Sequence, residues 1–100
     1  MKTKPHFTAL LTYTSTEEGG KTAPVSSGDR PGFKFPFDEK LFTGIQKFAG
    51  TELVFPGDSV HADITLLNPE QLTATIYEGM DFDFYEGDKL TGHGTVTALY

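Results

Sequence analysis

Hydrophobic and polar residues alternate along most of this chain with a period of two. The alternation runs through residues 7–14, 33–37, 60–66, 72–76, 80–84 and 96–100. Successive side chains of a β-strand point to opposite faces of the sheet, so each stretch predicts a strand with one face buried and the other in water. One dry and one wet face is typical of antiparallel sheets. The pattern therefore predicts an all-β protein.

The residue types agree with this prediction. Fourteen threonines and nine phenylalanines favour strands, and prolines at 5, 24, 31, 36, 56 and 69 interrupt every long helical window. The one ambiguous stretch is 38–50, where Leu41, Ile45 and Phe48 also fit the apolar stripe of a helix. Gly44 counts against that helix, and we expect a strand there.

Turn-forming residues separate the predicted strands. They occupy a long segment, 15–30, and shorter ones at 49–50, 55–58, 68–69 and 86–89. Short strands at this spacing are typical of a sandwich or a barrel, and closing the sheet removes exposed strand edges. The chain has 100 residues, which is the size of one domain, and we expect residues 1–100 to form it.

Charge is distributed unevenly. The net charge is −6; residues 1–50 hold 7 basic and 5 acidic groups, whereas residues 51–100 hold 9 acidic groups and the single cation Lys89. We interpret the acidic half as a solvated surface. There is no cysteine, no apolar run long enough to span a membrane and no signal-peptide core, so a cytoplasmic location is expected.

Several short motifs resemble functional sites but lack an essential part. Residues 15–22, STEEGGKT, approach a phosphate-binding loop, but Ser15 replaces its first glycine and Pro24 follows where a helix must begin. We therefore expect no nucleotide. Asp81 and Asp83 resemble the start of a calcium loop, but Tyr85 stands at the third ligand position.

No catalytic or metal-binding constellation is predicted. Asp81 and Asp83 alternate outward on an open strand face, whereas a glycosidase pair requires two carboxyl groups in different environments. The three histidines are each isolated in sequence, so no metal or other cofactor is expected. Five cations of the first half would suit phosphate binding, but the overall charge opposes nucleic acid; they are Lys21, Arg30, Lys34, Lys40 and Lys47.

Seven short segments, taken together, resemble the third, C-terminal domain of elongation factor Tu. They stand in the family's order at nearly its spacing: TEEGGK (16–21), RPGFKF (30–35), TG (43–44), FPGDSV (55–60), LLNP (66–69), GMDFDFYEG (79–87) and GHGTV (92–96). The resemblance covers about residues 7–99. It implies a closed antiparallel β-barrel of six strands, or seven.

The resemblance also implies a kind of partner. In the family this barrel contacts the T-stem backbone of aminoacyl-tRNA and packs on the GTPase domain and on the exchange factor. The chain has no GTPase domain, so the resemblance implies no GTPase activity. Carried over position by position, it identifies a binding face with these residues: Lys21, Arg30, Thr43, Glu86, Gly87 and Lys89.

The binding face departs from the family at several positions. Gly32 stands where the family has Gln, Thr22 where it has His, and Tyr85 and Asp81 where it has Arg. Each lost cation lowers affinity for phosphates. We expect a non-enzymatic binding module that contacts tRNA or a translation-related protein. Two alternatives stay open: a small ligand-binding or enzymatic barrel with its site at the barrel mouth, and a structural relic.

Overall fold

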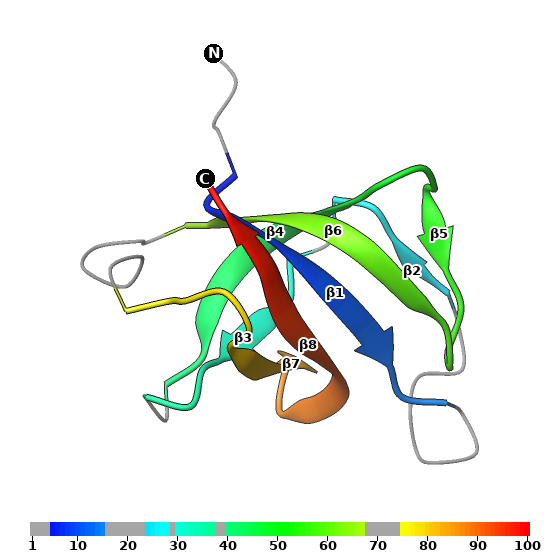
Figure 1. Ribbon diagram of the computed structural model, residues 1–100. Helices are drawn as coiled ribbons and strands as arrows, with labels where there is room; N and C mark the ends of the chain where they lie inside the picture. Colours follow the sequence, from blue (N-terminus) through cyan, green and yellow to red (C-terminus); the bar gives the residue numbers. More distant parts are fainter. Residues whose placement is uncertain (1–4, 16–23, 29, 38–39, 68–74) are drawn as a thin grey trace.

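The computed structural model describes residues 5–15, 24–28, 30–37, 40–67 and 75–100 (Figure 1). These residues form eight strands and no helix: β1 (Phe7–Tyr13), β2 (Val25–Ser26), β3 (Gly32–Lys34), β4 (Phe42–Phe48), β5 (Leu53–Val54), β6 (Ser59–Leu66), β7 (Asp81–Glu86) and β8 (Lys89–Leu99). The described part accordingly holds no helical segment that could cross a membrane. The expected all-β class is confirmed.

Six of the strands close into a barrel in the order β1-β6-β4-β3-β7-β8. All the pairings in it are antiparallel, and β1 closes the ring because it pairs with β6 on one side and with β8 on the other. The two short strands β2 and β5 pair with each other outside the barrel (Figure 1). The closed six-stranded antiparallel barrel expected from the sequence is confirmed.

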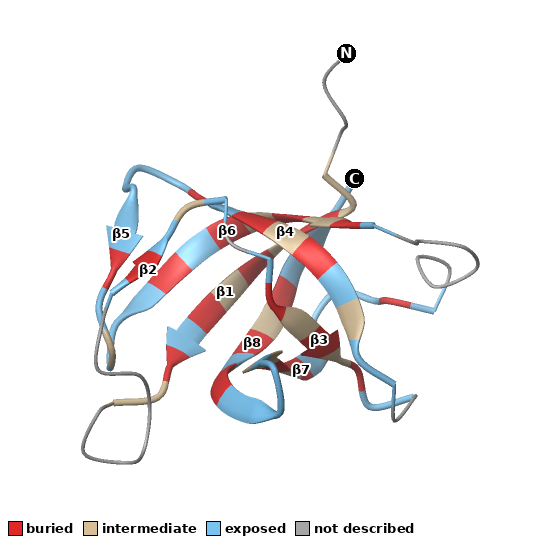
Figure 2. Cartoon of the chain, turned by 180° about the vertical axis from the view of Figure 1, so that it is seen from behind, coloured by how far each residue is buried: buried red, intermediate tan, exposed pale blue. Residues whose placement is uncertain are grey.

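The alternation along the strands sorts side chains between the barrel interior and its surface. β1 reads buried at every second residue, and Figure 2 shows the same alternation of buried and exposed residues along β6. Aromatic rings fill the middle of the barrel. Phe82 makes edge or tilted contacts with Phe7, Phe33 and Phe35 at centroid distances of 5.9, 5.6 and 5.6 Å.

Two glycines of β8 make room for these rings. Gly92 lies directly opposite Phe84 and Gly94 directly opposite Phe82 in the β7–β8 pairing. A side chain at either glycine would collide with the facing phenyl ring, and at Gly92 also with the backbone oxygen of Thr12. The packing of the two phenyl rings against β8 therefore explains the two glycines of its GHG sequence.

Not every predicted stretch forms a regular strand. In the predicted stretch 33–37 the strand β3 ends at Lys34, and Phe37 is 39% exposed. In β4 the strand is confirmed, but Gln46 is buried and Ile45 only half-buried, because Gly44, Gln46 and Phe48 share the inner face. Residues 72–74 lie outside the described residues, and Thr75 and Ile76 are not in a strand.

The C-terminal stretch 96–100 also differs from the expected pattern. A shift in the β1–β8 register beside Thr8 interrupts the alternation after Val96. Ala98 and Tyr100 are consequently exposed, and the Tyr100 hydroxyl donates to Asp63 Oδ1 on the barrel surface at 3.1 Å. In β8 the alternation of buried and exposed residues therefore ends where the β1–β8 register shifts.

Candidate functional site

The strand order brings four of the six predicted site residues to one cavity. Arg30 precedes β3, Thr43 lies in β4, Glu86 is the last residue of β7, and Gly87 follows it in the turn. β3 sits between β4 and β7, with Gly32 opposite both Thr43 and Tyr85. These four residues line a cavity of about 310 Å³ at one end of the barrel. We call this cavity and its lining residues the rim cavity.

The other two predicted residues are placed differently. Lys89 lies opposite Glu86 across the two-residue turn between β7 and β8, but it is not part of the cavity lining. Lys21, together with the rest of residues 16–23, lies outside the described residues. The structure thus gathers Arg30, Thr43, Glu86 and Gly87 and sets Lys89 beside them.

The mouth of the rim cavity carries both charge signs and apolar surface. Arg30, which precedes β3, and Glu86, the last residue of the neighbouring strand β7, are both exposed. Leu41 is 45% exposed, and a side chain added at Gly32 would lie 3.3 Å from its Cβ. Beside Gly32 the rim therefore presents the aliphatic surface of Leu41.

The interior wall of the cavity contains an unexpected polar group. Gln46 is only 1% exposed, and its Nε2 donates to the Tyr13 hydroxyl at 2.7 Å. Its Oε1 has no hydrogen-bond partner among the residues that the structure describes. Both side chains line the cavity. A buried acceptor without a donor costs about 1–3 kcal/mol, so this atom calls for an explanation.

The remaining inner wall is made by β7 and β8. Phe84 is fully buried and packs edge-on against Tyr13, with ring centroids 4.9 Å apart. A register shift after Phe84 turns Thr91 inward beside Gly92, and the Thr91 hydroxyl donates to the Phe84 carbonyl at 3.1 Å. The wall near Gln46 is consequently aromatic, and the Thr91 hydroxyl already has its acceptor.

Sequence reasoning did not identify Gln46 or Thr91 as site residues. In β4 the apolar residues Ile45 and Phe48 are three apart, so they cannot both face inward in a regular strand. Taking Phe48 as the inner residue places Gln46 inside as well. This argument from the alternation of a single strand could have identified Gln46 from the sequence. No local feature of the sequence predicts the β7–β8 register shift that turns Thr91 inward.

A second polar group lies on the outside of the barrel. His93 faces Asp83 on one neighbouring strand and Thr12 on the other, and its Nδ1 lies 2.6 Å from Asp83 Oδ1. A carboxylate, an imidazole and a hydroxyl in this order resemble the triad of hydrolases. The His93 and Asp83 side chains are 62% and 41% exposed, however, whereas oxyanion stabilisation requires a site that excludes water. We interpret this group as a surface polar ladder.

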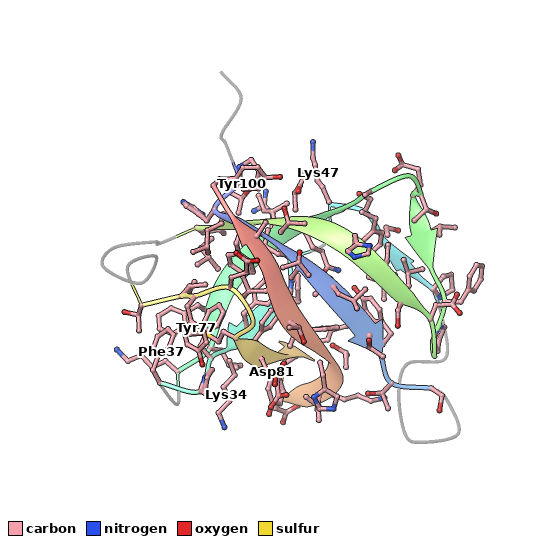
Figure 3. All side chains as sticks on the ribbon, in the orientation of Figure 1. Lys34, Phe37, Lys47, Tyr77, Asp81 and Tyr100 are labelled. Atoms are coloured by element: carbon pink, nitrogen blue, oxygen red, sulfur yellow. The ribbon has the colours of Figure 1, made fainter. Side chains whose placement is uncertain are left out.

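A wide, open hollow of about 730 Å³ lies beside β3 and β7. Lys34, Phe37 and Asp81 line it, and Figure 3 shows these three side chains close together at one edge of the barrel. Phe37 stacks on Phe35 with centroids 5.5 Å apart and an interplanar angle of 2°. The hollow is open to solvent and carries charges of both signs, so it does not define a recognisable ligand site.

The described residues include no group of three or more His, Asp or Glu side chains arranged to hold a metal ion. No known protein-family model matches the chain. Function therefore has to be argued from the rim cavity and its surroundings.

Proposed function

We propose that this protein is a non-enzymatic binding module of the elongation factor Tu third-domain type, and that its rim cavity binds a translation-related protein. The observation that carries the proposal is the gathering of Arg30, Thr43, Glu86 and Gly87 around one cavity. These residues come from segments far apart in the sequence. The cytoplasm, where translation takes place, is the location this proposal implies.

The charges of the rim favour a protein over tRNA as the partner. Binding to a nucleic-acid backbone depends on several cations that neutralise phosphates. Here Glu86 and Asp88 accompany Arg30 and Lys89, and Asp81 and Asp83 follow along the adjoining strand β7. A surface with both signs and an exposed leucine suits a protein interface, in which apolar anchors are ringed by complementary charges.

The proposed partner class is one that recognises the third domain of elongation factor Tu. The resemblance names the exchange factor as such a protein, and we take it as the test partner. Calorimetric titration of the purified chain with the exchange factor should give saturable binding. The charge reversals Arg30→Glu and Glu86→Lys should each weaken it about tenfold or more, because each sets like charges against each other across the interface.

Lys47→Glu is the matched control. Lys47 is an exposed cation on the outer face of β4, and Figure 3 shows its ammonium group pointing away from the barrel. Its charge reversal alters the net charge as Arg30→Glu does, but away from the rim cavity. Equal losses in the two variants, or no binding by the unaltered chain, would rule out the proposed protein interface.

A titration with tRNA at two salt concentrations separates the RNA alternative. RNA binding would weaken with salt by about 0.7–0.9 logarithmic units per phosphate contact for each tenfold rise in salt. We expect no saturable tRNA binding even at low salt. Tight binding that is lost in Arg30→Glu and weakens steeply with salt would replace the protein partner by tRNA.

A further inference from the structure

We propose that His6 is a pH-sensitive latch on the barrel: its neutral imidazole holds the end of β6 against the start of β1, and protonation of the ring opens this contact. The backbone N–H of Leu66 donates to His6 Nδ1 at 2.9 Å. A ring nitrogen that accepts a hydrogen bond carries no proton, so the contact exists only with the neutral imidazole, whose proton is then on Nε2. The latch is independent of the proposed function.

His6 lies where three strands of the barrel meet. Its own N–H donates to the Ile64 carbonyl of β6 at 2.8 Å, and its carbonyl accepts from the N–H of Tyr100, which follows β8, at 3.2 Å. The start of β1 and the end of β8 lie side by side at this corner of the barrel (Figure 1). Together with the ring bond to Leu66, these contacts join the strands that close the barrel through both the backbone and the side chain of His6.

Protonation of the ring removes the acceptor of a buried donor. Leu66 is 3% exposed, and buried backbone N–H groups nearly always have an acceptor. An imidazolium has an N–H on both ring nitrogens, so Nδ1–H would point at the Leu66 N–H, donor against donor. The ring would then turn away and leave the Leu66 N–H without the acceptor it has in the folded protein, which weakens this corner of the barrel.

The charged groups around this corner do not compensate for a proton on His6. The strand β1 carries no charged side chain, β6 contributes Asp63, β4 contributes Lys47 opposite it, and the phenol of Tyr100 follows β8. Asp63 Oδ1 accepts from the hydroxyls of Thr8 and Tyr100, and among the described residues it forms no ion pair with His6. Protonated His6 would therefore lose its bond to Leu66 without gaining a carboxylate partner there.

The test compares the pH dependence of folding in the unaltered chain and in His6→Asn. Asparagine offers an acceptor oxygen that does not titrate. Urea unfolding at pH 7.5 and at pH 5.5 gives the folding equilibrium constant of each protein. A free imidazole gains its proton between these two pH values, at about pH 6.5. We therefore expect the ratio of the two constants, unaltered chain over variant, to fall about fivefold or more from pH 7.5 to pH 5.5, because the other titratable groups are common to both proteins and cancel.

His61→Asn is the matched control. His61 is an exposed imidazole on the outer face of the same strand, β6, so this variant also removes one titratable ring. The ratio of folding constants between the unaltered chain and His61→Asn should stay the same at both pH values. A constant ratio for His6→Asn, or an equal change in the two variants, would overturn the latch.

NMR of the isotope-labelled, unaltered chain tests the latch even if His6→Asn fails to fold. At pH 7.5 the ring nitrogen signals of His6 should show a proton on Nε2 and none on Nδ1. As the pH is lowered, the amide signal of Leu66 should move in step with the ring signals of His6. A proton on Nδ1 at pH 7.5, or a ring that gains its second proton while the Leu66 amide does not respond, would overturn the latch.

Discussion

At the scale of single residues, small and large side chains of the barrel are matched across strands. Phe82 and Phe84 on β7 face Gly94 and Gly92 on β8, so each ring lies over a position without a side chain. The interior is close-packed, and a group added at such a position has to displace a ring or the backbone. The glycines are therefore as much a part of the core as the phenylalanines.

Gly92→Ala is expected to destabilise the protein by about 2–4 kcal/mol, because the new methyl group would collide with the Phe84 ring and with the Thr12 backbone oxygen. Urea unfolding followed by circular dichroism measures this loss. Leu99→Ala, at an exposed position of the same strand, is the control and should change stability by less than about 1 kcal/mol. Similar values for the two variants would contradict the packing described for β8.

The hydrogen bond between Gln46 and Tyr13 leads to a second prediction. Tyr13→Phe removes the acceptor of Gln46 Nε2 and leaves the whole buried amide without its observed partner, which should cost about 1–3 kcal/mol. Gln46→Met combined with Tyr13→Phe should recover most of this loss, because no orphaned amide then remains. Unfolding energies of the two single variants and the double variant form the cycle that measures the coupling. Additive losses would show that the two side chains act independently.

At the scale of the elements, the β7–β8 hairpin shapes the rim cavity. Glu86 and Lys89 pair across the two-residue turn of Gly87 and Asp88, and Gly87 has a φ of +63°. Tight hairpin turns of this length require such left-handed backbone, which glycine adopts without strain. The conformation of Gly87 thus explains why a glycine follows Glu86, independently of any partner.

Gly87→Ala should therefore lower stability by about 1–2 kcal/mol through backbone strain alone, since an added methyl group meets no atom within 4 Å. Gly87→Asn should cost less, because asparagine tolerates left-handed backbone better. Thermal unfolding of the two variants checks this order. If Gly87→Ala destabilised the protein no more than Gly87→Asn, the left-handed backbone of the turn would not explain the glycine at this position.

At the scale of the whole molecule, the barrel is held closed by its first and last strands. β8 pairs with both β1 and β7, so the two ends of the described chain complete the ring together. An open barrel would leave β1 and β7 with unpaired edges, which promote aggregation. The fold should consequently be gained or lost as one unit.

Removal of residues 89–100 should abolish the cooperative fold, whereas removal of Tyr100 alone should be tolerated. The larger deletion takes away β8 with its pairing to two strands. Tyr100 is 72% exposed and contributes side-chain hydrogen bonds to Thr8 and Asp63 on the surface. Circular dichroism and size-exclusion chromatography distinguish a folded monomer from an unfolded or aggregated chain. A folded, soluble product of the larger deletion would contradict the closed-barrel account.

The sequence by itself indicated most of the segments that become strands, and the spacing of its turns favoured a sandwich or a barrel. Alternation is a local property, because it follows from the geometry of each strand. The tertiary structure alone decided that Gln46 Oε1 has no donor among the residues described, that Thr91 turns inward, and that Arg30, Thr43 and Glu86 share one cavity. These facts depend on strand order and register across the barrel, which no single segment specifies, because residues become neighbours only when the ring has closed.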